Sequence, residues 1–420
     1  MSQETKQLFT ELFDDDLSPS SAYRKFIDNV ENEEHLADRF WVPDYKWVFN
    51  FYAQYIKRKF GTLNGIDVYY KIVENIESYN NDRGKELAKV KQTETGETIV
   101  VICDEFNRRV HENIPSAGDI LIMDATSNLD RMDTKIFHLM CPSPVGGLPL
   151  GTMIMTRANE NTIKEALDLY KTVLPDNAFY GKGRNAGPEI AMTDDDSAER
   201  NALKSTWNNI TLLLCQFHHL NALWGWLWKR EHDILLDDRP VLFNLVKRAV
   251  YARSNEEFDE AIETMEENDI YEKYENFKNH FETNILPRQK EWAIKERINK
   301  KLPTHGQNTT NYVEYSFRVT KDIQFSRLKA YNLVDLVDIC LDDSKLNSRR
   351  CVDVSHNRNY HLFTNQKSRY LEQNNKIDSK NIIKITDLKY KVPSEALEDK
   401  LYNVDMEKGI FDCRVGQTWK

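Results

Sequence analysis

Short apolar runs and amphipathic segments alternate between residues 98 and 220, and this alternation predicts a sheet with helices packed on it. The apolar runs lie between turn-forming residues, as buried strands do, and the segments between them have helical periodicity. The predicted strands are GDILIMDAT, KIFHLMCP, LPLGTMIM, PEIAMTD and ITLLLCQFH, and the predicted helices are ENTIKEALDLYKTVLP and DSAERNALKSTW. The order βββ-α-β-α-β predicts an α/β fold with a mixed sheet flanked by helices.

The pattern on either side of this segment is different. Residues 1–97 have helical periodicity followed by a polar stretch at 76–97 that we expect to be loop or charged helix, and residues 221–305 read as helix throughout. We expect residues 306–345 to form the last helices of the core. Residues 346–420 begin with a polar, Asn-rich stretch and end with short segments that resemble strands. The chain therefore divides into five regions, with a large all-helical insertion at 221–305.

Two aspartates close predicted strands of the sheet. Asp124 ends the first strand and Asp194 ends the fourth, and these strands are neighbours in a sheet of this order. A lone Asp after a strand is more often a turn or helix-cap residue. Asp195 and Asp196 directly follow Asp194, so the second acidic residue of the pair could also lie one or two residues later. We choose Asp194 because it directly follows the strand, whereas Asp196 resembles the cap of the next helix. Paired carboxylates suit Mg²⁺ or Mn²⁺, which prefer oxygen ligands.

A third acidic residue lies beyond the helical insertion. Glu314 shares one helix face with Arg318 and Lys321 by i, i+4, i+7 spacing. A carboxylate in this setting could reach a metal ion while the two basic side chains bind DNA phosphates. Taken alone, Glu314 and Arg318 are more simply an ordinary surface ion pair.

Cys215 and His218 are a further pair that could bind metal. Cys215 and His218 have Cys-x-x-His spacing, but a structural zinc site needs four ligands and no second pair is adjacent. We therefore expect them to lie beside the carboxylates as a supporting or structural pair rather than as a zinc site. Cys413, near the end of the sequence, reads on its own as a free buried thiol.

Composition narrows the class of protein. The net charge of −10 argues weakly against nucleic-acid binding, although a local basic track would suffice for it. The six cysteines are far apart, which favours a reducing compartment. No secretory signal, membrane-spanning run or strong basic import cluster is visible, and no phosphate loop, serine-hydrolase elbow or dinucleotide motif occurs.

Four of these segments together resemble the transposase domain of Mutator-like elements (MULE transposases). They are GDILIMDAT, MTDDDSAERNALKSTW, LLLCQFHHLNALW and TNYVEYSFR, and RVHENIPSAGD upstream is also similar. The family pattern has an Asp after the first strand, a Thr-Asp at the fourth, a Cys-x-x-His motif, and a Glu after a helical insertion. The resemblance spans roughly residues 100–330 and assigns the acidic trio to Asp124, Asp194 and Glu314, with Cys215 and His218 as the Cys-x-x-His pair.

The resemblance implies an RNase H-like core and a DDE-type DNA transposase, which cuts phosphodiester bonds and joins strands with two Mg²⁺ or Mn²⁺ ions. It also implies double-stranded DNA as partner, a homo-oligomer on that DNA, no membrane, and a nuclear location. The alternatives are a domesticated derivative that binds DNA or chromatin without catalysis, and a protein-binding scaffold built on the Trp-rich segment around Trp226.

The last residues have a resemblance of their own. YNVDMEKGIFDCRVG is similar to the opening of a SWIM-type zinc finger, which often follows this core, and includes Cys413. The Cys-x-His second half is not seen. The sequence leaves open whether the chain is a fragment or the finger has decayed, and we see no intact N-terminal DNA-binding zinc module.

Overall fold

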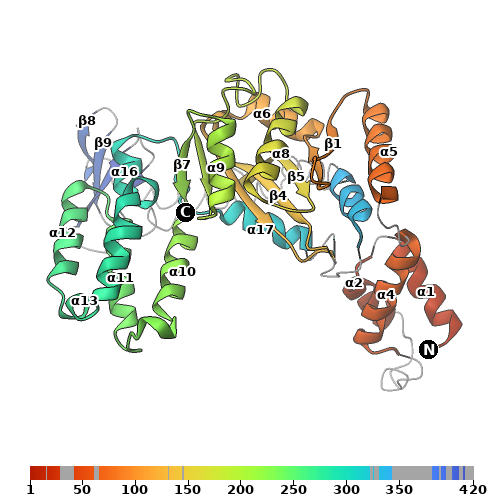
Figure 1. Cartoon of the computed structure of the whole chain (residues 1–420), viewed down its shortest axis with the longest axis horizontal. Helices are drawn as coiled ribbons and strands as arrows, with labels where there is room; N and C mark the ends of the chain where they lie inside the picture. The colour runs from red at the N-terminus through yellow and green to blue at the C-terminus, as the bar shows by residue number, and fades with distance from the viewer. Residues whose placement is uncertain are drawn as a thin grey trace.

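The computed structural model describes residues 1–15, 17–28, 42–60, 66–130, 132–143, 146–321, 325, 331–342, 381–386, 389–393, 400–405 and 410–411. Cys413 and the Asn-rich segment at 346–380 lie outside these residues. Figure 1 shows a central sheet, with helices of the N-terminal part on one side and the helical segment that follows the sheet on the other.

A seven-stranded mixed sheet is the centre of the structure. Its strands are β1 (Ala88–Gln92), β2 (Thr98–Ile102), β3 (Ile120–Thr126), β4 (Lys135–Ser143), β5 (Gly146–Met155), β6 (Ile190–Thr193) and β7 (Thr211–Leu214), in the spatial order β1-β2-β5-β4-β3-β6-β7. β3, β4 and β5 form an antiparallel meander, whereas β6 is parallel to β3 and β7 is parallel to β6. The predicted mixed α/β sheet is confirmed, and it is broadly compatible with an RNase H-like fold.

The edge hairpin β1–β2 was not expected. We predicted loop or charged helix over 76–97, which is right for the end of helix α5 (Ile66–Arg83) and for the loops at 84–87 and 93–97, but wrong for Ala88–Gln92, which form β1. β1 then pairs antiparallel with β2. Lys89 and Lys91 alternate with apolar positions in its sequence, AKVKQ, and charged edge strands of this kind give a weak hydrophobic signal.

One face of the sheet is covered by helices α6 (Glu105–Asn113), α7 (Pro115–Asp119), α8 (Glu160–Val173) and α9 (Ser197–Thr206). Leu121 and Met123 of β3 point to this face, and they share a buried cluster with Leu167 of α8 and Leu203 of α9. Successive side chains alternate across a strand, so Ile120 and Ile122 point to the other face.

The opposite face is covered by two groups of helices. Helix α17 (Asn311–Val319) packs on β3 and β4, where Val313 and Phe317 contact the cluster around Ile120 and Ile122. The N-terminal helices and helical residues 333–342 form a second cluster with β2 and β5. The N-terminal helices are α1 (Gln3–Asp14), α2 (Pro19–Asp28), α4 (Tyr45–Phe60) and α5.

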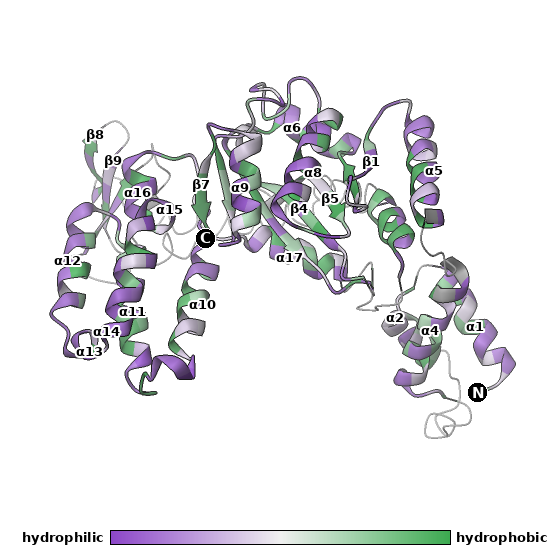
Figure 2. Cartoon of the chain, viewed as in Figure 1, coloured by the Kyte–Doolittle hydropathy of each residue, from purple (hydrophilic) through white to green (hydrophobic). Residues whose placement is uncertain are grey.

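Residues 216–299, all of which the structure describes, form helices and no strand, as expected for the insertion. The elements are α10 (Gln216–Leu227), η1 (Arg230–His232), α11 (Arg239–Tyr251), α12 (Asn255–Glu266), α13 (Asp269–Lys273), α14 (Glu275–His280), η2 (Phe281–Ile285), η3 (Leu286–Arg288), α15 (Gln289–Trp292) and α16 (Ile294–Asn299). They pack around a core of their own that contains the fully buried Trp292. In Figure 2 the hydrophobic colour gathers on the central strands, while α12 and α13 are largely hydrophilic.

The predicted end of the last strand of the central sheet is wrong. We expected ITLLLCQFH to be a single strand, but β7 ends at Leu214 and α10 begins at Gln216. Cys215 is the residue between them, so His218 lies in the first turn of a helix.

The strand-like pieces near the C-terminus are confirmed. β8 (Ile383–Thr386), β9 (Lys389–Pro393), β10 (Leu401–Asp405) and β11 (Ile410–Phe411) form a separate antiparallel sheet in the order β11-β10-β9-β8. Among the described residues, none of the helices has the length and apolarity needed to cross a membrane.

Candidate active site

Asp124 and Asp194 stand at one edge of the sheet because their strands are parallel neighbours. Ile122 of β3 is in register with Met192 of β6, and each aspartate follows its register residue by two positions. The carboxyl ends of parallel strands meet at the same edge of a sheet. The two side chains are both half-buried there.

The electrostatics of Asp124 indicate that several negative groups share this edge. Burial, then the charge of Asp194 and to a lesser extent that of Glu314, raise its pKa to about 7. A hydrogen bond from the Ala125 amide and the charge of His218 oppose this rise. Like charges in a half-buried place disfavour ionisation unless a cation balances them. This acidic edge of the sheet therefore favours the binding of a cation.

His218 lies between Asp194 and Glu314. Its Nδ1 is 2.5 Å from Asp194 Oδ1, and its Nε2 is 3.6 Å from Glu314 Oε1. The contact with Asp194, followed by that with Cys215, raises the pKa of His218 to about 10. The ring is therefore protonated at neutral pH, and it joins the end of β6 to α17.

Glu314 is in the first turn of α17, whose apolar residues fix the helix on the sheet. Thr310 lies just before the helix, is fully buried, and its hydroxyl is 3.3 Å from Glu314 Oε1. The same hydroxyl and the Thr310 amide both lie 3.4 Å from Cys215 Sγ. Sequence reasoning missed Thr310, because a threonine before a helix has the ordinary composition of a cap.

Cys215 is buried and sits at the start of α10. Burial alone would raise the pKa of its thiol, but contacts with His218 and Thr310 outweigh burial and lower it. Within the described part of the chain, Asp194, Cys215 and His218 form one group of possible ligands whose atoms lie within 4.8 Å of one another.

This group fits a hydrogen-bonded support better than zinc. Ligand atoms around a tetrahedral zinc ion stand roughly 3.3 Å apart, given bonds of about 2.0 Å. The 2.5 Å between His218 Nδ1 and Asp194 Oδ1 is much shorter and fits a charged contact. The carboxylates themselves fit Mg²⁺ or Mn²⁺, because both ions prefer oxygen donors.

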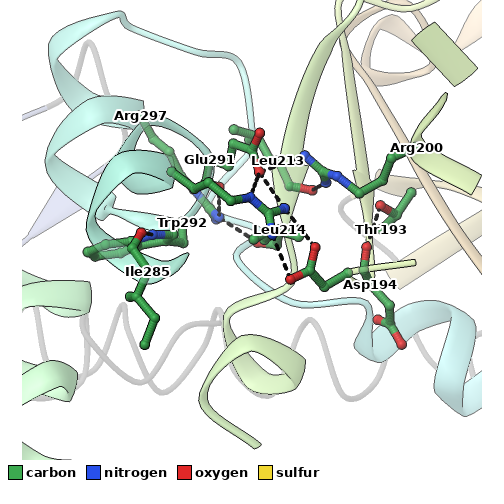
Figure 3. A network of polar contacts seen from close by, with 11 residues as sticks. Thr193, Asp194, Arg200, Leu213, Leu214, Ile285, Glu291, Trp292 and Arg297 are labelled. Carbon is green, nitrogen blue, oxygen red and sulfur yellow. Dashed lines mark hydrogen bonds and ion pairs between the residues drawn. The ribbon is translucent and has the colours of Figure 1, made fainter. Parts of the chain in front are cut away.

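An arginine network attaches the helical insertion to the sheet beside this edge (Figure 3). Arg200 of α9 is 2.8 Å from Glu291 of α15, and Arg288 forms hydrogen bonds of 2.6 and 2.8 Å with both carboxylate oxygens of Asp195. Figure 3 shows the Asp194 side chain directed away from this network. Sequence reasoning did not identify these arginines, whose partners are up to 93 residues away.

A fourth acid, Glu199, also lies near the edge. It is in the first turn of α9 and only 7% exposed. Burial and then the charges of Asp124, Asp196 and Asp194 raise its pKa to about 9. Sequence reasoning missed it, because Asp196-x-x-Glu199 reads as an ordinary helix start.

The two predicted DNA-binding side chains are on or just after α17. Arg318 is exposed, one helical turn beyond Glu314, and Lys321 is half-buried just past the end of the helix. Their predicted contact with DNA stays a prediction.

No protein-family model matches the chain. No curated protein matches it either. The geometry of the site and the motifs that build it therefore carry the functional argument.

Proposed function

We propose that the chain is a DNA transposase of the Mutator-like class, with an RNase H-like core and a DDE site made of Asp124, Asp194 and Glu314. One observation carries this proposal. Asp124 lies near the end of β3, Asp194 directly follows the adjacent parallel strand β6, and Glu314 is on a helix packed across β3 and β4. His218 lies against both Asp194 and Glu314, so that three segments distant in sequence contribute to one site.

The three carboxylates would hold two Mg²⁺ or Mn²⁺ ions. When bound, such ions activate an attacking water or 3′-hydroxyl and stabilise the leaving oxygen in phosphoryl transfer. The chain's own residues orient these ligands: His218 fixes Asp194 through the 2.5 Å contact, and Thr310 holds Glu314 at 3.3 Å. Both neighbours restrict the carboxylate rotamers, which lowers the entropy lost when a cation binds.

DNA would approach along α17. Arg318 is exposed one turn from Glu314 and can contact a phosphate without leaving the helix. The net charge of −10 is compatible with this role, because phosphate binding depends on local side chains and the acidic site contributes to the sum. A homo-oligomer on DNA and a nuclear location belong to the same proposal.

The test is Mg²⁺-dependent nicking of a supercoiled plasmid, with joining of a 3′-hydroxyl oligonucleotide as a second assay. Asp124→Asn, Asp194→Asn and Glu314→Gln keep side-chain volume and remove one charge each. We expect each to reduce nicking to the level seen with EDTA. Asp196→Asn is the matched control, because Asn caps a helix as well as Asp does, and it should cut like the wild type.

Two results count against the proposal. Folded Asp124→Asn and Asp194→Asn proteins that nick at the wild-type rate would remove the acidic trio from the chemistry. A wild-type protein that binds DNA but neither binds Mn²⁺ nor cuts would support the domesticated, non-catalytic alternative.

A further inference from the structure

His138 is a buried polar residue next to the acidic edge, and it is only 9% exposed. It lies on β4 directly opposite Asp124 of β3, and the two residues are register partners in an antiparallel pair. Side chains of such partners point to the same face of a sheet, with Cβ atoms roughly 5 Å apart. Helix α17 covers that face, since Ile122, two residues before Asp124, packs against it. The His138 side chain is therefore beside one acid of the proposed site and under the helix that carries Glu314.

A hydrogen bond connects His138 to this helix. His138 Nδ1 is 2.7 Å from Ser316 Oγ, and the Ser316 hydroxyl donates to the Val313 carbonyl, also at 2.7 Å. Because the hydroxyl proton is used in that second contact, the histidine must supply the N–H of the first. The ring also packs on Phe317, with 5.0 Å between the ring centroids. His138 is therefore a hydrogen-bond donor to α17 as well as a packing residue.

The placement of α17 depends on contacts of this kind. The helix has 9 residues, and isolated helices shorter than about 12 residues are marginal in water. Its apolar anchors, Val313 and Phe317, hold it by packing, which is not directional. A hydrogen bond is directional, so the contact between His138 and Ser316 fixes the rotation of the helix about its axis. Glu314 is two residues before Ser316, so a rotation or slide of α17 would move its carboxylate relative to the strand ends.

We propose that His138 is a positioning residue of the acidic site, which sets the placement of Glu314 relative to Asp124 by binding Ser316. This inference rests on the proposed function. Thr310 holds Glu314 from the N-terminal end of α17, and His138 holds the same helix from the face that packs on the sheet. The two contacts together would fix the third acid of the site.

Two substitutions in the full chain separate hydrogen bonding from packing. In His138→Asn the side-chain amide can take the place of Nδ1 and donate to Ser316. In His138→Gln the amide reaches the place of Nε2 instead, although Gln is nearer to His in size. We expect Mn²⁺ titration calorimetry to give an affinity at least about tenfold weaker than wild type for His138→Gln, and within about threefold for His138→Asn. A residue that only fills space would give the opposite order.

Ser316→Ala removes the acceptor of the same hydrogen bond and should weaken Mn²⁺ binding about as much as His138→Gln does. The double variant should bind no more weakly than either single one, because both substitutions remove one interaction. His111→Gln is the matched control, since it replaces another buried histidine, on α6 at the opposite face of the sheet. It should lower Tm and keep wild-type Mn²⁺ affinity at temperatures where the protein is folded.

The outcomes separate this inference from the function on which it rests. If Asp194→Asn loses Mn²⁺ while both His138 variants keep wild-type affinity, His138 does not position the site and the proposed function stands. If His138→Gln lowers Tm at unchanged Mn²⁺ affinity, or binds Mn²⁺ better than His138→Asn, His138 is a packing residue and the inference fails. If the wild type binds no Mn²⁺, the proposed function fails and this inference fails with it.

Discussion

At the scale of single residues, the site depends on side chains that orient the acids. Thr310 is the clearest example, because one buried hydroxyl lies within 3.4 Å of Cys215 Sγ, His218 Nδ1 and Glu314 Oε1. These contacts connect the start of α10 with the first turn of α17, and the two segments are nearly a hundred residues apart in sequence. Its removal should disturb the acids without removing any of them.

We expect Thr310→Val to weaken Mn²⁺ binding and to slow plasmid nicking about tenfold, because Glu314 loses its hydroxyl partner while the residue's volume is kept. Thr310→Ser retains the hydroxyl and should stay within about twofold of the wild type. Equal activity of the Val and Ser variants would mean that the hydroxyl does not orient Glu314.

Sequence could predict some of these residues and not others, for a physical reason. Asp124 and Asp194 interrupt apolar runs, and the cost of a charge at a strand end makes each visible as an anomaly. Glu199 and Thr310 occur where their residue types are common, beside a helix start. Their burial arises only from tertiary packing, which no local pattern reports.

At the scale of elements, the end of β7 depends on the helical insertion. Arg297 of α16 is buried, and its guanidinium donates to the Leu214 carbonyl at 2.7 Å and to Asn308 Oδ1 at 2.6 Å. The Gln216 amide donates to the Asn308 carbonyl at 2.9 Å. Because Leu214 and Gln216 flank Cys215, the insertion fixes where the first turn of α10, with His218, begins.

We expect Arg297→Met to lower the free energy of unfolding by about 3 kcal/mol, since it removes charged hydrogen bonds and leaves the Leu214 carbonyl unpaired. Urea denaturation measures this change. Lys300→Met is the matched control, because Lys300 is exposed and makes only a surface ion pair with Glu296, worth less than about 1 kcal/mol. Similar losses in both variants would contradict the structural role given to Arg297.

Element boundaries were predictable where hydrophobic contrast is strong. The five core strands and both core helices follow apolar runs or amphipathic periods, and the structure contains all of them. The misplaced end of β7 shows the limit: LLLCQFHH continues apolar past Leu214, so hydrophobicity does not mark the turn into α10. The backbone turns there because Arg297 and Asn308 bind its polar groups.

At the scale of the whole molecule, helix α6 and the segment after α8 are held against the sheet through one buried histidine. His111 Nε2 lies 2.9 Å from the Tyr170 hydroxyl and 3.2 Å from the Leu150 carbonyl, and the Phe179 amide donates to Nδ1 at 3.4 Å. Burial lowers the pKa of His111 to about 3. The folded protein therefore keeps the ring neutral in mildly acidic solution.

This shift predicts a loss of global stability in acid. Below the ordinary histidine pKa of about 6.5, the unfolded chain binds a proton at His111 that the folded chain excludes. The contribution of His111 is therefore full above pH 6.5 and falls by about 1.4 kcal/mol per pH unit as the pH drops toward 3. Urea unfolding at pH 7.5, 6 and 5 measures the slope.

His111→Gln is the comparison for this prediction, because Gln can still bind the Leu150 carbonyl but does not titrate. Its stability should be lower at pH 7.5 and fall less steeply with acid than that of the wild type. Parallel slopes for the two proteins would show that His111 does not govern the acid response.

The position of α17 has a consequence for synthesis of the chain. The ribosome makes every strand of the central sheet before it makes Asn311, so Ile120, Ile122 and Met140 lack their cover of Val313 and Phe317 until that helix emerges. A polypeptide halted within the insertion would display an apolar sheet face and lack Glu314. Such a product is prone to aggregate. Under the proposed function it would also lack one of the three acids, so the helix that covers the core would complete the site as well.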